Sequence, residues 1–186
     1  MFKSILGSIG IAAILLLSIF ILLYNKLIRI KNLVAEAWSG IDIQLKRRYD
    51  LIPNLVATVK GYSDHEAATL TKVTQLRTIA MGATSVNDKI MAEAALTDTL
   101  KTLFAVAESY PELKASNNFA NLQTELSNIE EQLQLARRYY NGVVREYNSS
   151  IQTFPNNLVA NFLQYKPEPF FEINNYEERR TPKVSF

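Results

Sequence analysis

The sequence predicts an all-α protein with an N-terminal transmembrane helix, an antiparallel bundle of long helices and an aromatic C-terminal tail. Three observations lead to this prediction. Residues 5–24 form an uncharged apolar run, and apolar residues then recur at spacings of three and four. Prolines and aromatic residues gather in the last part of the chain. We therefore expect an anchor over 1–25, a bundle over 26–153, and a short helix with an extended tail over 154–186.

The composition of the 186 residues excludes several classes of protein. Without cysteine the chain cannot form disulfides or thiolate metal sites, and its one histidine, His65, leaves no room for a histidine-rich site. The net charge is only +2, and acidic residues outnumber basic ones from Tyr49 onward. A nucleic-acid-binding protein shows a basic body instead. We expect no cofactor and no nucleic-acid partner.

The first element is predicted to be a membrane anchor. Thirteen of the twenty residues from 5 to 24 are Leu, Ile or Phe. At about 1.5 Å per residue a helix of this length spans roughly 30 Å, the thickness of a hydrocarbon core. A cleaved signal peptide is the alternative interpretation. Neither an Ala-x-Ala site nor a lipobox cysteine follows Tyr24, so we expect the anchor to stay attached.

Basic residues follow the anchor directly. Lys26, Arg29 and Lys31 flank it on the C-terminal side, whereas Lys3 is the only charged side chain before it. The positive-inside rule then predicts a cytoplasmic body with the N-terminus outside, and a periplasmic or extracellular body stays open as the alternative. The same bases are expected to contact anionic headgroups, which makes the lipid bilayer the first predicted partner.

Small residues lie on one face of the anchor. Ser4, Ser8 and Ala12 follow a small-xxx-small spacing, which lets two such helices approach closely. This ridge and the apolar bundle surface predict a homo-oligomer.

The bundle is predicted from four apolar stripes, each on one face of a helix. A turn is expected over 82–87, Pro111 ends the third stripe, and Asn117 or Asn118 caps the longest helix. The stripes are Leu27, Ile30, Val34, Trp38, Ile41 and Leu45; Leu55, Val59, Tyr62, Leu70, Val73, Leu76 and Ala80; Ile90, Ala94, Leu100, Leu103, Phe104 and Ala107; and Phe119, Leu122, Leu126, Ile129, Leu133, Ala136, Tyr140, Val143, Tyr147 and Ile151.

Pro53 interrupts an otherwise continuous apolar pattern. Asp50 can serve as an N-cap and place Pro53 in the first turn of a new helix, where its missing N–H costs nothing. We therefore expect a kink or short break near Asp50. Upstream, residues 25–30 contain neither Gly nor Pro, so the first helix is expected to continue directly from the anchor.

The C-terminal segment changes in composition. Phe154 and Pro155 end the long helix, Asn156 or Asn157 can cap a short helix, and prolines extend residues 165–171. In one interpretation this segment folds back and covers the side or end of the bundle. In the other it forms a docking surface for the bilayer interface or a partner. The docking candidates are Phe154, Phe162, Tyr165, Phe170 and Phe171.

Several blocks resemble a known family. The run from Ala37 to Val56, AWSGIDIQLKRRYDLIPNLV, is similar to the signature of the LemA family, bacterial proteins with one N-terminal span. The blocks YPELKA at 110–115, YYNGVVREYNSSIQTFP at 139–155 and KPEPFF at 166–171 follow in the family's order. The resemblance implies an antiparallel helical bundle on a membrane anchor and no known reaction. Members are often encoded near a heat-shock membrane zinc protease, which implies a membrane protease as a partner.

Two polar clusters interrupt the stripes. Arg47, Arg48 and Asp50 precede Pro53, and Arg145 lies next to Glu146 in the longest helix. If buried, these charges have to pair and would fix the register of the helices; the alternative is an ordinary solvated face. The Glu-x-x-His spacing of a carboxylate metal site is absent, as is a Gly-rich phosphate loop. We expect no catalytic and no metal-binding residue.

The leading functional prediction is a membrane-anchored, non-enzymatic helical scaffold that self-assembles or binds another membrane protein. The alternative is an adaptor or regulator of a membrane metalloprotease in envelope stress, which rests on the gene neighbourhood of the family. A hydrolase that uses the carboxylates near Asp50 or Glu146 is the third and weakest interpretation.

Overall fold

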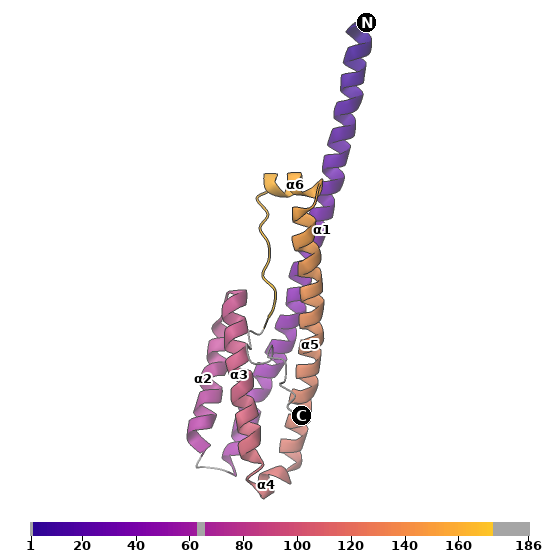
Figure 1. Ribbon diagram of the computed structural model, residues 1–186. Helices are drawn as coiled ribbons and strands as arrows, with labels where there is room; N and C mark the ends of the chain where they lie inside the picture. The colour runs from indigo at the N-terminus through magenta and orange to yellow at the C-terminus, as the bar shows by residue number, and fades with distance from the viewer. Residues whose placement is uncertain (1, 63–65, 173–186) are drawn as a thin grey trace, which may run out of the picture. The chain divides into compact units, whose positions relative to one another are not determined.

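The computed structural model describes residues 2–62 and 66–172, so the single histidine, His65, lies outside the described residues. In this part of the chain all regular structure is helical, which confirms the all-α class (Figure 1). The helices are α1 (Phe2–Lys60), α2 (Ala67–Gly82), α3 (Val86–Ala107), α4 (Pro111–Lys114), α5 (Asn117–Gln152) and α6 (Asn156–Phe162).

The chain forms two compact units. Unit 1 combines the part of α1 up to Asp42 with Leu135–Phe170. Unit 2 combines Ile43–Gln134 with Phe171. Both α1 and α5 therefore contribute to each unit. The division into segments 1–25, 26–153 and 154–186 stays a prediction.

The apolar run and the following segment form one helix. α1 continues from Phe2 to Lys60 without a break, which confirms that the first helix extends from the anchor. Within the described residues α1 is the one helix that is long and apolar enough to cross a membrane. None of the residues in its most apolar stretch is buried. The exposed side chains in this part include Ile9, Ile11, Ile14, Leu15, Leu16, Leu17, Ile19 and Leu22.

A kink or short break was predicted near Asp50. The break is wrong, because α1 runs through Pro53, and the kink stays a prediction. A proline inside a helix has no N–H, so the carbonyl of Tyr49, four residues earlier, loses its partner within the helix. Arg77 on α2 supplies a donor instead: its Nε donates to the Tyr49 carbonyl over 2.7 Å. The bond from α2 satisfies the acceptor that Pro53 leaves open, so the proline does not end the helix.

This arrangement predicts an energetic coupling between Pro53 and Arg77. Arg77→Met should lower the free energy of unfolding by about 1–3 kcal/mol, because a buried carbonyl then has no donor. In a Pro53→Ala background, where residue 53 provides its own N–H, the same substitution should cost less than about 1 kcal/mol. Denaturant unfolding of the full chain in detergent measures all four proteins. Equal costs in both backgrounds would contradict the prediction.

The break after α1 falls at Gly61, so the second predicted stripe is divided between the end of α1 and α2. The turn expected over 82–87 is confirmed: Ser85 precedes α3, and its Oγ accepts from the backbone N–H of Asp88 over 3.1 Å. The start of α5 differs from the prediction. Asn117 is already helical, and the Ser116 carbonyl accepts from the N–H of Ala120 over 3.1 Å.

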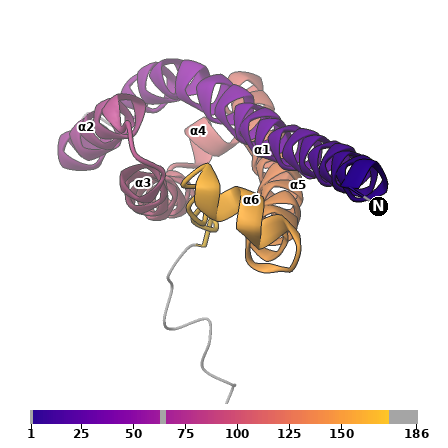
Figure 2. The same cartoon turned by 90° about the horizontal axis from the view of Figure 1, so that it is seen from above.

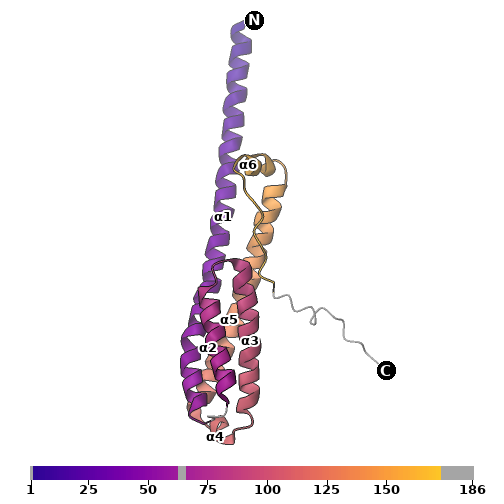
Figure 3. The ribbon, with the colours of Figure 1, turned by 90° about the vertical axis from the view of Figure 1, so that its left-hand side faces the viewer.

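Unit 2 is a helical bundle built on these apolar faces. α2 and α3 lie side by side with the second part of α1 and the first part of α5 (Figure 3). Burial of one apolar face on each helix stabilises the packing. Its fully buried apolar side chains include Leu45, Leu55, Val59, Val73, Leu96, Leu103, Leu113 and Leu133.

Unit 1 packs α1 against the second part of α5 and the returning tail. The ring of Trp38 on α1 meets the buried ring of Tyr140 on α5 edge-on, with 5.4 Å between centroids. At the end of α5, helix α6 turns crosswise and lies close to α1 (Figures 1 and 2). The predicted asparagine cap of α6 is wrong. Pro155 precedes the helix, and the Asn156 side chain donates to the Ser150 hydroxyl over 3.1 Å.

The tail folds back along α5, as one of the two interpretations predicts. The hydroxyl of Tyr140 donates to the carbonyl of Pro169 over 3.0 Å, and that of Tyr147 donates to the carbonyl of Lys166 over 3.2 Å. Asn148 makes two bonds with the backbone of Glu168, accepting its N–H over 2.8 Å and donating to its carbonyl over 2.9 Å. Side chains of α5 thus pair with tail groups that no helix or sheet would satisfy.

Candidate functional site

A cluster of buried charges lies inside unit 2. The side chain of Arg48 on α1 is only 4% exposed, and its Nη1 lies 3.3 Å from a carboxylate oxygen of Glu93 and 3.3 Å from one of Glu130. Its Nη2 donates to the hydroxyl of Thr97 over 2.8 Å. Glu93, 0% exposed, also accepts a hydrogen bond from the hydroxyl of Tyr49. The cluster ties together α1, α3 and α5.

The chemistry of this cluster suits a structural role. An arginine guanidinium stays protonated, so Arg48 can neither give nor take a proton in a reaction. Both oxygens of Glu93 already accept hydrogen bonds, from Arg48 and from Tyr49. Sliding α1 or α3 by one residue would separate Arg48 from Glu93 and leave their buried charges unpaired, which is costly, whereas Glu130 on α5 is 32% exposed. The arrangement is therefore suited to fixing helix register.

Arg48 was among the register residues predicted from the sequence, whereas its partners Glu93 and Glu130 were not. A signal was present for Glu93, because Ile90, Glu93, Leu96 and Leu100 follow helical spacing and place a charge on an otherwise apolar stripe. Glu130 stands beside Ile129 at the edge of the stripe on α5 and carries no comparable signal. Which arginine these acids meet is decided by packing between helices.

The other register candidates lie on the surface. Arg47 and Asp50 are exposed and line a polar hollow of about 390 Å³ in unit 2, together with Gln44 and Glu125. Arg145 and Glu146, the second polar cluster, are exposed in unit 1, and Pro53 is exposed on α1. Their role in register or interaction stays a prediction.

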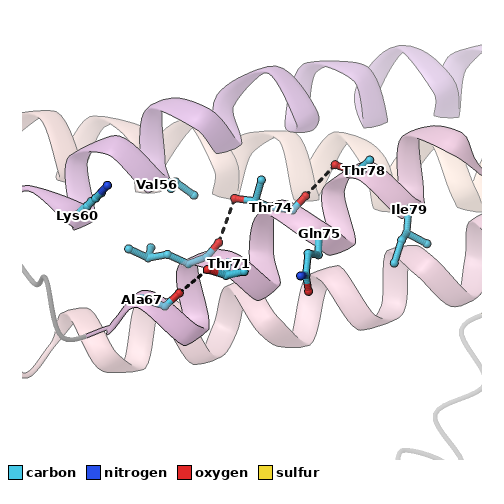
Figure 4. A pocket seen from close by; sticks show the side chains of 9 residues that line it. Val56, Lys60, Ala67, Thr71, Thr74, Gln75, Thr78 and Ile79 are labelled. Atoms are coloured by element: carbon cyan, nitrogen blue, oxygen red, sulfur yellow. Dashed lines mark hydrogen bonds between the residues drawn. The ribbon is translucent and has the colours of Figure 1, made fainter.

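A second hollow, of about 660 Å³, lies between α1 and α2 in unit 2 (Figure 4). Its lining includes Val56, Leu70 and Ile79, and Lys60 is the only charged residue among the lining residues. The hydroxyls of Thr71, Thr74 and Thr78 donate to backbone carbonyls of their own helix, each four residues earlier. The walls thus present few free polar groups, which suits apolar contact more than acid–base chemistry.

The basic residues after the anchor have two environments. Lys26 and Arg29 are exposed on α1, as contact with headgroups requires. The Nζ of Lys31 lies 4.5 Å from the centroid of the Tyr165 ring, a cation–π geometry. Tyr165 in turn lies 6.4 Å from the ring of Tyr147, between centroids. Lys31 therefore helps hold the tail against α1.

The five aromatic docking candidates are not on one surface. Phe171 is buried in unit 2, and Tyr165 is half-buried against Tyr147 and Lys31. Phe170 is 36% exposed. Phe154 and Phe162 are 80% and 76% exposed. Leu158, which the list of candidates omits, is exposed between them at a spacing of four residues, a signal that was available in the sequence.

Comparison with known proteins places the chain in a family. The model described as LemA family matches residues 37–186. The chain belongs to the LemA family. Protein LemA from Metamycoplasma hominis is 31% identical over 172 residues, which cover 88% of this chain and 77% of that protein. Magnetosome proteins MamQ 1 and MamQ 2 from Paramagnetospirillum magneticum are each 22% identical over 195 residues, covering 91% of this chain and 70% of theirs.

Family membership and the exposed apolar helix together make this LemA family chain a membrane-associated protein. Across residues 2–62 and 66–172, no group of three or more His, Cys, Asp and Glu side chains is arranged to hold a metal ion. The polar contacts of Arg48, Tyr140, Tyr147 and Asn148 join helix to helix or helix to tail.

Two tyrosines that hold the tail in this LemA family chain, Tyr140 and Tyr147, have raised pKa values. Burial, and secondarily the charge of Glu168, raises the pKa of Tyr140 from 10.0 to about 12. The same two causes raise the pKa of Tyr147. Loss of either proton would place a negative charge close to the carbonyl that the hydroxyl now contacts.

The pKa of Tyr140 predicts how stability depends on alkaline pH. Between about pH 10 and about pH 12 the unfolded chain releases this proton while the folded chain retains it. The free energy of unfolding should therefore fall as pH rises through this window, and the contribution is lost above the folded pKa. Denaturant unfolding at several pH values should show a shallower fall for Tyr140→Phe than for the unsubstituted chain. Identical slopes would contradict the prediction.

Proposed function

We propose that this LemA family chain is a membrane-anchored, non-enzymatic helical scaffold that assembles with copies of itself. One observation carries the proposal: a single uninterrupted helix, α1, contains the exposed apolar segment and also the buried faces of both units. Ile30 and Val34 on this helix pack in unit 1, and Leu45 and Leu55 pack in unit 2. In such a chain the membrane-spanning segment and the folded body share one continuous helix, which holds the body at the membrane.

Three further features support a structural role. Arg48 and Glu93, two buried charges, are engaged with each other, and the hollow between α1 and α2 has few free polar groups. Exposed apolar side chains on unit 2, among them Ile43, Ile79 and Met91, offer surface for a second copy. The names of the two MamQ relatives state a location, the magnetosome, and no reaction. Assembly at a membrane is the activity that these features suit best.

The size of the extracted particle tests the proposal. The full chain is crosslinked in native membranes, extracted in mild detergent and analysed by mass photometry and by mass spectrometry of the crosslinked species. A closed set of several copies of this chain is the expected result. A particle that holds one copy of the chain and no other protein would overturn the scaffold proposal. A particle in which one copy is crosslinked to a membrane protease would favour the adaptor function instead.

We also propose that the body lies in the cytoplasm. Lys26, Arg29 and Lys31 follow the anchor, and the positive-inside rule holds such residues on the cytoplasmic side. Since the chain has no cysteine, Lys101→Cys provides a single thiol at an exposed site on α3. A membrane-impermeant maleimide should label it only after cells are permeabilised, whereas Lys3→Cys should react in intact cells. The reverse pattern would place the body outside.

A further inference from the structure

Three large, exposed apolar side chains lie on α6 or just before it. Phe154, Leu158 and Phe162 are separated by four residues each and are 80%, 61% and 76% exposed. On α6 itself Val159 and Ala160 are buried, so this helix already has an inner face. Leu158 and Phe162, one helical turn apart, form its outer apolar face, and the exposed Phe154 lies two residues before the helix begins. We call these three exposed side chains the α6 face. A face of this kind is unfavourable in water.

The position of the α6 face relates it to the anchor. The ring of Phe162 meets the ring of Phe20 edge-on, with 6.2 Å between centroids. Phe20 belongs to the uncharged apolar run and precedes its last residue, Tyr24, by four residues. Four residues of helix rise about 6 Å, so Phe162 lies beside the last turn of the anchor. In a bilayer this level is the boundary between acyl chains and headgroups.

The local composition also suits that boundary. From Ile151 to Tyr165 the chain has no charged residue, and the next residue, Lys166, is basic. Lys26 and Arg29 are exposed on α1 just beyond the anchor. Aromatic residues favour the interface, and basic residues next to an apolar face favour contact with phosphate headgroups. Lipid therefore matches this face better than a folded polar partner does.

We propose that the α6 face inserts into the interfacial layer of the same bilayer that holds α1, as a second membrane contact of this chain. The inference rests on the anchored state that the proposed function also assumes, and it is independent of self-assembly. An isolated spanning helix can rotate about its axis and tilt. A second contact from α6, which packs in the same unit, sets the rotation of unit 1 at the membrane.

Depth-dependent quenching tests the proposal on the full chain. Since the chain has no cysteine, single thiols are introduced by Leu158→Cys and Phe162→Cys and labelled with an NBD fluorophore. Tyr139→Cys is the matched control, because Tyr139 is an exposed apolar residue of α5 in the same unit, far from α6 along that helix. Each protein is placed at one chain per nanodisc of phosphatidylcholine and phosphatidylglycerol, with doxyl-phosphatidylcholine labelled at carbon 5 or carbon 12.

The expected result is shallow insertion. The carbon-5 quencher should reduce emission at positions 158 and 162 about twofold more than at 139, and more than the carbon-12 quencher does. Equal, weak quenching at all three positions would overturn the proposal. A parallel set of discs is loaded with several chains each. Shielding of 158 and 162 in that set alone would also overturn the proposal, because a second copy would then cover the face. The quenching result in discs that hold one chain does not depend on whether the scaffold proposal survives.

Discussion

Arg48→Met is expected to lower the free energy of unfolding by about 3–5 kcal/mol, the largest effect that we predict for a single substitution in unit 2. The guanidinium lies 3.3 Å from carboxylates of Glu93 and Glu130, and Glu93 is fully buried. Without Arg48 the buried carboxylate of Glu93 and the 32% exposed carboxylate of Glu130 lose the positive charge that compensates them. A methionine fills the space of the arginine stem but cannot compensate either charge, so the loss reflects electrostatics more than packing.

Circular dichroism during denaturation of the full chain in detergent measures this effect. Arg47→Met is the matched control: the neighbouring arginine is exposed, and its replacement should change stability by less than about 0.5 kcal/mol. Combining Arg48→Met with Glu93→Gln should recover part of the loss, because the remaining cluster then holds one carboxylate instead of two. If Arg48→Met costs no more than Arg47→Met, the buried cluster has no structural role.

Tyr140→Ala is expected to cost about 3–5 kcal/mol in unit 1. The Tyr140 side chain is almost fully buried and packs edge-on against Trp38. Its hydroxyl also holds the tail through the carbonyl of Pro169. Truncation to alanine leaves a cavity between α1 and α5 and releases that carbonyl, so loss of packing and loss of a hydrogen bond add up.

The chain provides its own reporter for this prediction. Trp38 is the only tryptophan, so the fluorescence emission of the protein follows the environment of the Tyr140 ring. Tyr140→Ala should shift this emission to the red and lower the midpoint of unfolding, whereas Tyr140→Phe should keep the emission and lose only about 0.5–1.5 kcal/mol. Tyr139→Ala, at an exposed neighbour, should change neither quantity. Unchanged emission in Tyr140→Ala would show that the rings do not pack together.

Most elements of the fold could be predicted because they depend on short-range patterns. The uncharged run up to Tyr24 is long enough to span a bilayer whatever its neighbours are, and it forms part of one exposed helix. The stripe from Phe119 to Ile151 became α5 for a similar reason, since spacings of three and four need only one helix to produce an apolar face. The turn at Ser85 depends on a cap that reaches three residues along the chain.

Errors occurred where a residue's environment comes from a distant part of the chain. A kink or short break was expected near Asp50, before Pro53. The expected break is absent, because Arg77 on another helix supplies the donor that replaces the missing bond. Tyr165 was a docking candidate in one of the two interpretations of the tail, and its contacts with Lys31 and Tyr147 form only once the tail returns along α5. In both cases the partner lies more than fifteen residues away, beyond the reach of a local pattern.

The sequence alone therefore determined that this chain is helical, that its first helix is apolar enough for a bilayer and that it resembles the LemA family, since these depend on composition, periodicity and motif. Tertiary structure alone decided that Glu93 and Glu130 meet Arg48 and that Phe162 reaches Phe20. The physical reason is that burial and pairing of side chains depend on how separate helices pack, and many packings are compatible with the same apolar stripes.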